Sequence, residues 1–480
     1  MVFETVITNV NLLDGSGAPP VRADLAIAGG RIARIGALAG SPADAVFDGG
    51  GRTLCPGFID AHTHDDIVAI RTPGMLPKLS QGVTTVIVGN CGISAAPVTL
   101  TGAEPPDPMN LLGDAEVFRY PRFSDYVTAL EKARPAINVA ALVGHTALRA
   151  NHMDRLDRAA APDEIAAMRA QLSEALDHGA LGLSTGLAYL SAISAPTEEV
   201  VALAEPLAAA GGLYATHLRS ETAAILEAME EAFHVGRAAR VPVLVSHLKC
   251  AGVPNWGRSG DVLAAFDAAA QGQSVYCDCY PYTASSSTID LRQVTGDIDI
   301  TITWSQTHPE MAGRALRDIA AEWQIPEVEA AGRLQPGGAI YHCMTDADVD
   351  RILKHEATMI GSDGLPNDPR PHPRLWGTFP RVLGHYSRDR GLFPLAEAVR
   401  KMTSLPAARF GLSGRGLLRE GYWADLVLFD PGTVRDSATF LDPEVAAAGI
   451  EAVWVNGEAA YGRHGATGRR AGRFLPRASA

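Results

Sequence analysis

Hydrophobic and polar positions divide the chain into two β-rich ends and a long middle in which strands and helices alternate. Up to about residue 55, short alternating runs are separated by turns such as 14–17, and no helical period appears. The far end behaves alike, with apolar runs at 424–430 and 451–457. We therefore expect residues 1–55 and 415–480 to form one small β-sandwich from both chain ends.

Between residues 56 and 414, apolar runs rich in β-branched residues alternate with amphipathic segments, the pattern of repeated βα units and a parallel sheet. The runs predict a first strand before His62 and further strands at 83–88, 137–143, 181–184, 213–216, 241–246, 274–280 and 358–361. Helices are predicted at 162–178, 197–210, 221–239 and 260–271. Eight such units favour an α/β fold with a closed (β/α)8 barrel of the TIM type over an open sheet. An insertion is expected at about 287–345, where no barrel strand is evident.

Length and charge narrow the class of protein. A chain of 480 residues with 47% hydrophobic and 20% charged residues can bury a large core. The formal net charge of −13 comes with no Lys/Arg cluster, so neither nucleic acid nor an anionic membrane is an expected partner. The N-terminus lacks a basic segment followed by an apolar core, no apolar run could span a bilayer, and the six cysteines are irregularly placed. We expect a cytoplasmic protein.

Side chains that bind metals follow several predicted strands. His62 and His64 come after the first strand, and because residues i and i+2 of a strand leave the same face, both imidazoles can reach one ion. The second, fifth, sixth and eighth strands are followed by one further candidate each: Cys91, His217, His247 and Asp363. In a barrel these strand ends share one face. Each residue alone is compatible with a structural role, but together they predict a metal site.

The order of these residues, on a barrel flanked by a terminal β-sandwich, resembles the amidohydrolase superfamily. Within it the chain is similar to the N-acyl-D-amino-acid deacylases (D-aminoacylases), and in particular to the N-acyl-D-glutamate deacylase type. The local matches cover most of the chain and lie at 89–92, 144–149, 184–187, 246–249 and, most specifically, 372–384. The resemblance implies hydrolysis of an N-acyl-D-amino acid to a carboxylate and a D-amino acid. The D configuration rests on the resemblance alone.

The resemblance also implies a zinc centre with two unequal positions. Cys91, His217 and His247 would hold a tight Zn²⁺, whereas His62, His64 and Asp363 would form a weaker second site. Two-metal amidohydrolases usually bridge their ions with a carboxylated lysine or a glutamate, and neither the third nor the fourth strand end offers one. Cys91 is the available substitute, because a thiolate binds Zn²⁺ well and is deprotonated by coordination.

The expected chemistry follows from what zinc does to water. Zn²⁺ lowers the pKa of a bound water to about 7, which gives hydroxide at neutral pH, and it polarises an amide carbonyl. Asp363 would accept the proton as general base and later deliver it to the leaving amine as general acid. A turn aspartate before Gly364 is the structural alternative for this residue.

Cations in an acidic protein are candidates for binding the substrate carboxylate. Lys249 lies two residues beyond His247 and so points to the same side, and Arg374 stands in the loop after the eighth strand. Resemblance supports both cations in this role, with surface salt bridges as the alternative. It also supports Tyr189 and Tyr282 as phenol donors near the acyl group or carboxylate, although packing explains them equally well. His145 is either a site residue or a buried structural imidazole.

The substrate side chain is expected to contact the segment after the seventh strand. Residues 281–292 are polar and carry a cation, and Ser287 and Arg292 are candidate ligands for a second carboxylate. This favours N-acyl-D-glutamate, with the aspartate derivative as a further acidic substrate, over D-leucine or D-methionine derivatives. A solvated surface position would equally explain Arg292.

Three alternatives remain open: a deacylase of hydrophobic N-acyl-D-amino acids, a cyclic-amide hydrolase of the hydantoinase kind, and a catalytically silent scaffold. The hydantoinase reading fits poorly with Cys91 and the missing lysine bridge. The sequence leaves the oligomeric state undetermined.

Overall fold

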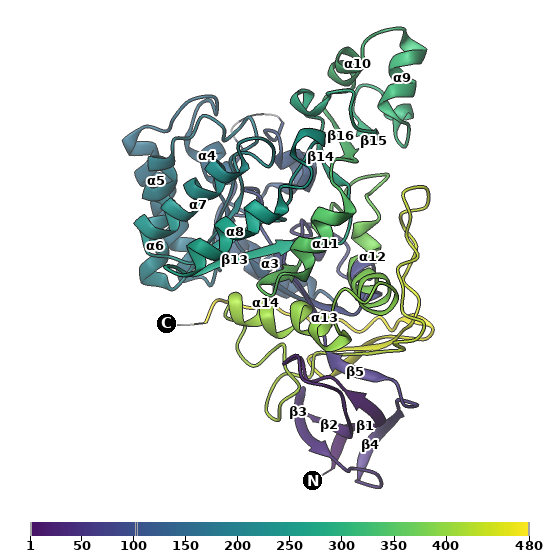
Figure 1. The fold of residues 1–480 in the computed structure, drawn as a ribbon. Helices are drawn as coiled ribbons and strands as arrows, with labels where there is room; N and C mark the ends of the chain where they lie inside the picture. Colours follow the sequence, from purple (N-terminus) through teal and green to yellow (C-terminus); the bar gives the residue numbers. More distant parts are fainter. Residues whose placement is uncertain (1, 101, 103, 479–480) are drawn as a thin grey trace.

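The two chain ends form one nine-stranded sheet, which lies at the bottom of Figure 1. The computed structural model describes residues 2–100, 102 and 104–478, so residues 1 and 479–480 of the expected terminal β-rich segments lie outside the described residues. The strands are β1 Phe3–Leu12, β2 Val21–Ala28, β3 Arg31–Gly36, β4 Ala43–Asp48, β5 Thr53–Pro56, β18 Leu426–Phe429, β19 Ile450–Val455, β20 Glu458–Gly462 and β21 Gly465–Ala466. Alternation buries Leu25 and Ile27 of β2 in the same apolar cluster as Leu426 and Leu428 of β18.

The middle of the chain forms a ring of parallel strands. These are β6 Phe58–Asp60, β7 Val83–Val88, β8 Asn138–Ala141, β9 Val143–Gly144, β10 Gly182–Gly186, β11 Leu213–His217, β12 Val243–Val245, β13 Val275–Cys279 and β17 Thr358–Ile360. β6, β7 and β8 pair in order, as do β9 to β13 and β17, and β8 and β9 belong to one run of chain interrupted only at Leu142. The backbone N–H of Ala61 donates to the carbonyl of Ile360, which links the last strand to the first. The fold is the expected (β/α)8 type.

Helices cover the outside of the ring, and α5 to α8 follow one another along its left side in Figure 1. The helices of this middle region are α1 Val68–Arg71, α2 Leu76–Leu79, α3 Phe123–Ala133, α4 His145–His152, α5 Pro162–Asp177, α6 Thr197–Ala210, α7 Ile225–Ala239, α8 Ser259–Ala270, α11 Asp346–Lys354, α12 Arg374–Arg381, α13 Leu395–Met402 and α14 Ser404–Arg409. The expectation that α7 begins at Glu221 is wrong. The carbonyl of Glu221 accepts from the N–H of Ala251 rather than from a helical N–H, so the helix begins four residues later.

The stretch expected as an insertion projects from the barrel at the upper right of Figure 1. It contains a three-stranded antiparallel sheet in the order β14-β16-β15 and two short helices. Their bounds are β14 Ser285–Thr288, β15 Ile300–Ser305, α9 Leu316–Trp323, α10 Glu327–Leu334 and β16 Gly337–Tyr341. Because β14 comes soon after β13, this sheet begins at the carboxyl end of the barrel.

The last described residues return to the barrel rather than ending in the terminal sheet. Gly472 donates to the carbonyl of Pro135, and Leu475 donates to that of Val139 in β8. Within the described part of the chain, no helix is long and apolar enough to cross a membrane.

Candidate metal centre

Three of the predicted ligands stand on backbone that L-amino acids rarely adopt. The φ angles of Cys91, His247 and Asp363 are 54°, 36° and 49°, and each residue follows the end of a barrel strand. Next to Cys91, a Cβ on Gly92 would lie 2.7 Å from the backbone nitrogen of Gly186, so the chain passes its neighbour closely there. Such local strain is typical of functional sites.

One candidate ligand group combines a thiol with two imidazoles. The ligand atoms of Cys91, His217 and His247 all lie within 4.8 Å of one another. Cys91 Sγ is 3.3 Å from Nε2 of His247, and the centres of the two imidazole rings are 4.5 Å apart. Nδ1 of His217 is buried and has no hydrogen-bond partner among the described residues. Sulfur and imidazole nitrogen are the ligands that structural and catalytic zinc ions take in proteins.

A second candidate group shares the same thiol. It contains His62, His64, Cys91 and Asp363, all buried, with ligand atoms again within 4.8 Å of one another. Cys91 Sγ lies 3.2 Å from Nε2 of His62, and Asp363 Oδ1 lies 3.2 Å from Nε2 of His64. The six residues predicted from the strand ends therefore form two adjacent groups around one sulfur, and their donor atoms fit zinc.

Neighbouring charges favour the ionised forms that bind metals. Burial alone would raise the pKa of the Cys91 thiol, but the imidazoles of His62 and His247 bring it well below its usual value. Burial also acts against ionisation of Asp363, yet Arg374 and the hydrogen bond with His64 hold the pKa of this carboxyl well below its ordinary range. The thiol and the carboxyl are thus poised as anions.

Buried polar residues that the sequence analysis did not identify contact the ligands, or the segments that carry them, on the side away from the shared thiol. Asp278 lies 3.4 Å from Nδ1 of His62 and accepts a hydrogen bond from the backbone N–H of His247. Lys78 is fully buried and donates to Asp60 at 2.8 Å and to Ser362 at 2.7 Å, which ties β6 to the segment before Asp363. The available signal is a charged residue inside an apolar strand, as at Asp278 in β13.

Arg374 lies beside the second ligand group, and two of its nitrogens have no hydrogen-bond partner in the described structure. It is fully buried, its Nη2 is 3.0 Å from Asp363 Oδ2, and the same nitrogen donates to the carbonyl of Ser286. Its Nε and Nη1 have no partner in the described structure, and the same holds for the Tyr280 hydroxyl and the Ser286 hydroxyl. The guanidinium carbon lies 4.7 Å from the centre of the Tyr280 ring. The sequence analysis did not identify Tyr280 as a neighbour of Arg374.

Lys249 reaches the other side of the centre. Its Nζ lies 2.5 Å from Oε1 of Glu221, 2.8 Å from Nδ1 of His247 and 5.7 Å from the centre of the Tyr280 ring. Glu221 was not identified from the sequence as a site residue, because the helical period included it in the helix that follows. Substrate binding by Lys249 stays a prediction, since its ammonium already contacts Glu221.

Tyr189, Ser287 and Arg292 lie together at the edge of the site. The Tyr189 hydroxyl is 3.1 Å from the Ser287 hydroxyl, and its ring centre is 4.9 Å from that of His217. The Arg292 side chain is 49% exposed, pairs with Asp290 at 2.8 Å and donates to the carbonyl of Ala188. Arg292 is thus next to the Tyr189 segment, but an acidic neighbour already occupies much of its guanidinium.

Two further candidates have other close partners. The Tyr282 ring lies 4.9 Å from the guanidinium carbon of Arg381 and edge-on to His372. His145 is buried, with Nε2 2.9 Å from Glu199, and burial lowers its pKa. A role of either residue in substrate binding stays a prediction.

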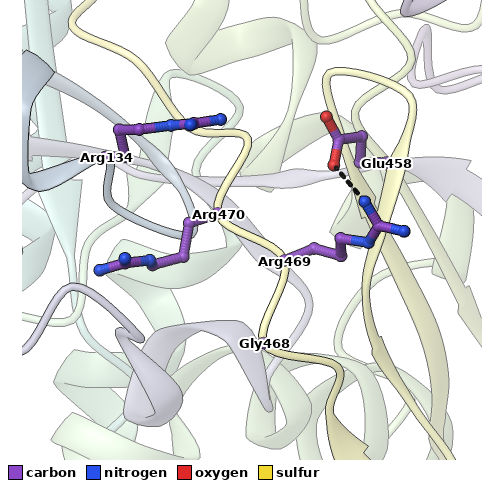
Figure 2. Close-up of a pocket in the computed structure, with 5 residues that line it drawn as sticks. All are labelled: Arg134, Glu458, Gly468, Arg469 and Arg470. Atoms are coloured by element: carbon purple, nitrogen blue, oxygen red, sulfur yellow. Dashed lines mark ion pairs between the residues drawn. The ribbon is translucent and has the colours of Figure 1, made fainter.

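A surface recess of about 290 Å³ lies away from these residues. Arg134, Glu458, Gly468, Arg469 and Arg470 line it (Figure 2). Arg470 donates to the carbonyl of Ala133 at the C-terminus of α3, where cations are favourable, and Arg469 lies 3.9 Å from Glu458. Arg469 and Arg470 thus have local structural partners, and the recess adds nothing to the metal centre.

Comparisons with known proteins identify the family of the chain. The model of the amidohydrolase family matches residues 45–274 and 311–461. Three proteins of Alcaligenes xylosoxydans xylosoxydans are similar over nearly their whole length. A D-aminoacylase is 51% identical, covering 100% of this chain and 98% of its own. An N-acyl-D-aspartate deacylase is 48% identical, with 98% and 94% covered, and an N-acyl-D-glutamate deacylase is 48% identical, with 99% and 97% covered.

Solved structures show the same relationship. A D-aminoacylase structure superposes with a TM-score of 0.97 at 51% sequence identity, and the match covers 99% of this chain and 100% of the D-aminoacylase chain. A second D-aminoacylase structure with the same scores describes a binuclear metal centre with one-metal activation and second-metal attenuation. An N-acyl-D-glutamate deacylase of Bordetella bronchiseptica, in complex with zinc and a phosphonate mimic of the tetrahedral intermediate, superposes at 0.96 with 46% identity, and both chains are fully covered. A D-hydantoinase, at 16% identity and a TM-score of 0.63 over 99% of both chains, shares the fold alone. The chain therefore belongs to the amidohydrolase family, together with the D-aminoacylases.

Proposed function

We propose that this protein is a zinc-dependent hydrolase of N-acyl-D-amino acids that releases a carboxylate and a free D-amino acid. One observation carries the proposal: two ligand groups that share the Cys91 thiol lie beside a buried arginine whose Nε and Nη1 have no partner among the described residues. The similarity to D-aminoacylase along the whole chain supports the same activity and the D configuration.

Cys91, His217 and His247 would hold the tight zinc ion, and His62, His64 and Asp363 a weaker second one. The orphaned Nδ1 of His217 and the low pKa of Cys91 fit this assignment. When bound, Zn²⁺ supplies a water with a pKa of about 7 and polarises the amide carbonyl.

The residues of this chain would then orient the substrate and move the proton. Arg374 would receive the α-carboxylate at Nη1, which has no partner in the described structure, because a hydrogen bond between a guanidinium and a carboxylate is charge-assisted. Its Nη2 holds Asp363 Oδ2, so Oδ1 faces the histidines. Oδ1 is the atom to take the proton during attack and to pass it to the leaving amine.

For the amino-acid side chain, we propose a preference for N-acyl-D-glutamate. Ser287 and Arg292 stand at the edge of the site next to Tyr189, where a distal carboxylate of an extended substrate could be bound. The two deacylases of acidic substrates at 48% identity support this choice.

A second candidate is hydrolysis of neutral N-acyl-D-amino acids. It is favoured by the ion pair between Arg292 and Asp290, which offsets the charge that an acidic side chain would need. The 51% identity to a D-aminoacylase fits this candidate as well.

The decisive experiment measures amine release from a panel of N-acetyl-D- and N-acetyl-L-amino acids by the zinc-loaded protein. Dihydrouracil is the cyclic-amide control, and its ring opening, which releases no amine, is followed by ultraviolet absorbance. We expect turnover of D substrates, led by N-acetyl-D-glutamate, and none of L substrates or dihydrouracil. A lead for D-leucine or D-methionine derivatives would select the second candidate. Turnover of dihydrouracil alone would reject both.

A further inference from the structure

We propose that Glu221 is a positioning residue that keeps His247 in the tautomer needed to bind zinc, against the competing charge of Lys249. The inference rests on the proposed zinc centre. It concerns a residue outside both ligand groups, placed between a predicted ligand and a predicted substrate-binding cation.

Two side chains of opposite charge meet at one nitrogen of His247. Oε1 of Glu221 lies 2.9 Å from Nδ1 of His247, and Nζ of Lys249 lies 2.8 Å from the same atom. The other ring nitrogen, Nε2, lies 3.3 Å from Cys91 Sγ. His247 is 2% exposed, so no bulk water competes for either nitrogen.

The two neighbours require opposite tautomers. An ammonium only donates, so a hydrogen bond from Lys249 would make Nδ1 an acceptor and leave the proton of a neutral imidazole on Nε2, toward the thiol. A carboxylate only accepts, so Glu221 requires the proton on Nδ1 and leaves the lone pair of Nε2 facing Cys91. Only the second state lets Nε2 bind a metal.

Glu221 also binds the Lys249 ammonium, which competes with it for Nδ1 of His247. Lys249 Nζ lies 2.5 Å from the same oxygen that faces His247, so the ammonium has a charged acceptor and need not donate to the imidazole. Oε2 of Glu221 lies 3.7 Å from Nε2 of His217, which leaves Nδ1 of that ring as its orphaned nitrogen. One carboxylate thus faces both histidines of the tight group.

The backbone holds Glu221 in this position. It follows β11 by a short loop, and its carbonyl accepts from the N–H of Ala251, two residues beyond Lys249. The loops after β11 and β12 are therefore tied together at the point where the three side chains meet.

The test measures zinc affinity by chelator competition on purified, metal-stripped full-length protein, independently of turnover. Glu221→Gln should weaken the tight zinc by about 10- to 100-fold, the usual effect of losing an outer carboxylate partner of a ligating histidine. The double variant Glu221→Gln with Lys249→Met should recover most of that loss, because the competing donor is gone. Glu231→Gln is the matched control: this carboxylate has similar exposure, pairs with Arg219 and should leave zinc affinity unchanged.

The outcomes separate this inference from the proposed function. If the wild-type protein binds no tight zinc, the proposed function fails. If it binds zinc tightly and Glu221→Gln binds equally well, or if the double variant recovers nothing, the inference is overturned. Should Glu221→Gln not fold by itself, comparing Lys249→Met with the double variant still decides: similar affinities support the inference, and a further large loss contradicts it.

Discussion

Two arginines predicted to bind carboxylates lie in opposite surroundings. Arg374, at the inner end of the site, is fully buried and has two nitrogens without a partner in the described structure. Arg292, at the edge, is 49% exposed in its side chain and paired with Asp290. A buried donor without a partner is costly, whereas an exposed ion pair contributes little. Arg374 is therefore the better candidate for binding a substrate carboxylate. Substitution of Arg374 should reduce activity more than substitution of Arg292.

The largest effect is expected at the innermost point. Cys91→Ala removes the only sulfur shared by both ligand groups, so the protein should lose its tight zinc and nearly all turnover. Metal analysis and an amine-release assay check this. Cys277→Ala, which removes a buried β13 thiol outside both groups, should keep both properties. Full zinc content in Cys91→Ala would contradict the assignment.

Asp363→Asn should separate proton transfer from tight metal binding. The amide cannot take up the proton, so turnover should fall by about 10²- to 10⁴-fold, the usual scale for a positioned acid or base. Zinc in the group of Cys91, His217 and His247 should remain, since Asp363 belongs to the other group. Turnover near that of the wild type would show that another residue moves the proton.

Arg374→Ala should damage every substrate. Loss of the two buried donors is expected to reduce transition-state binding by about 2–5 kcal/mol in kcat/KM, for acidic and neutral N-acetyl-D-amino acids alike. Arg374→Lys restores the charge but not the planar fork and should recover only part of the loss. A loss confined to one class of side chain would move Arg374 out of α-carboxylate binding.

The smallest effect on kcat/KM is expected for Arg292→Ala, which tests whether Arg292 contacts the substrate side chain. Because the guanidinium is exposed and paired, N-acetyl-D-glutamate should lose about 1 kcal/mol or less in kcat/KM, and N-acetyl-D-glutamine should barely change. Equal losses for both substrates would place Arg292 outside the side-chain pocket. A loss as large as that of Arg374→Ala would instead show that substrate displaces Asp290.

The barrel and the candidate ligands could be predicted from the sequence, because both follow from local order along the chain. Apolar runs mark buried strands, and in a barrel all their carboxyl ends meet on one face, so His62, Cys91 and Asp363 could be placed together without coordinates. Resemblance added the identity of the metal and the substrate class.

The spatial neighbours of these residues could not be predicted from the sequence, because they depend on the tertiary fold. Tyr280 and Tyr282 are two residues apart, so strand alternation would place both side chains on the same face. Instead, Tyr280 stacks on Arg374 and Tyr282 stacks on Arg381, because the alternation stops where β13 ends at Cys279. Glu221 fits the helical period, but a long-range hydrogen bond from Ala251 holds it outside α7 and beside His247. Contacts between residues far apart in the chain depend on how strands and loops are brought together, and no periodicity along the sequence records them.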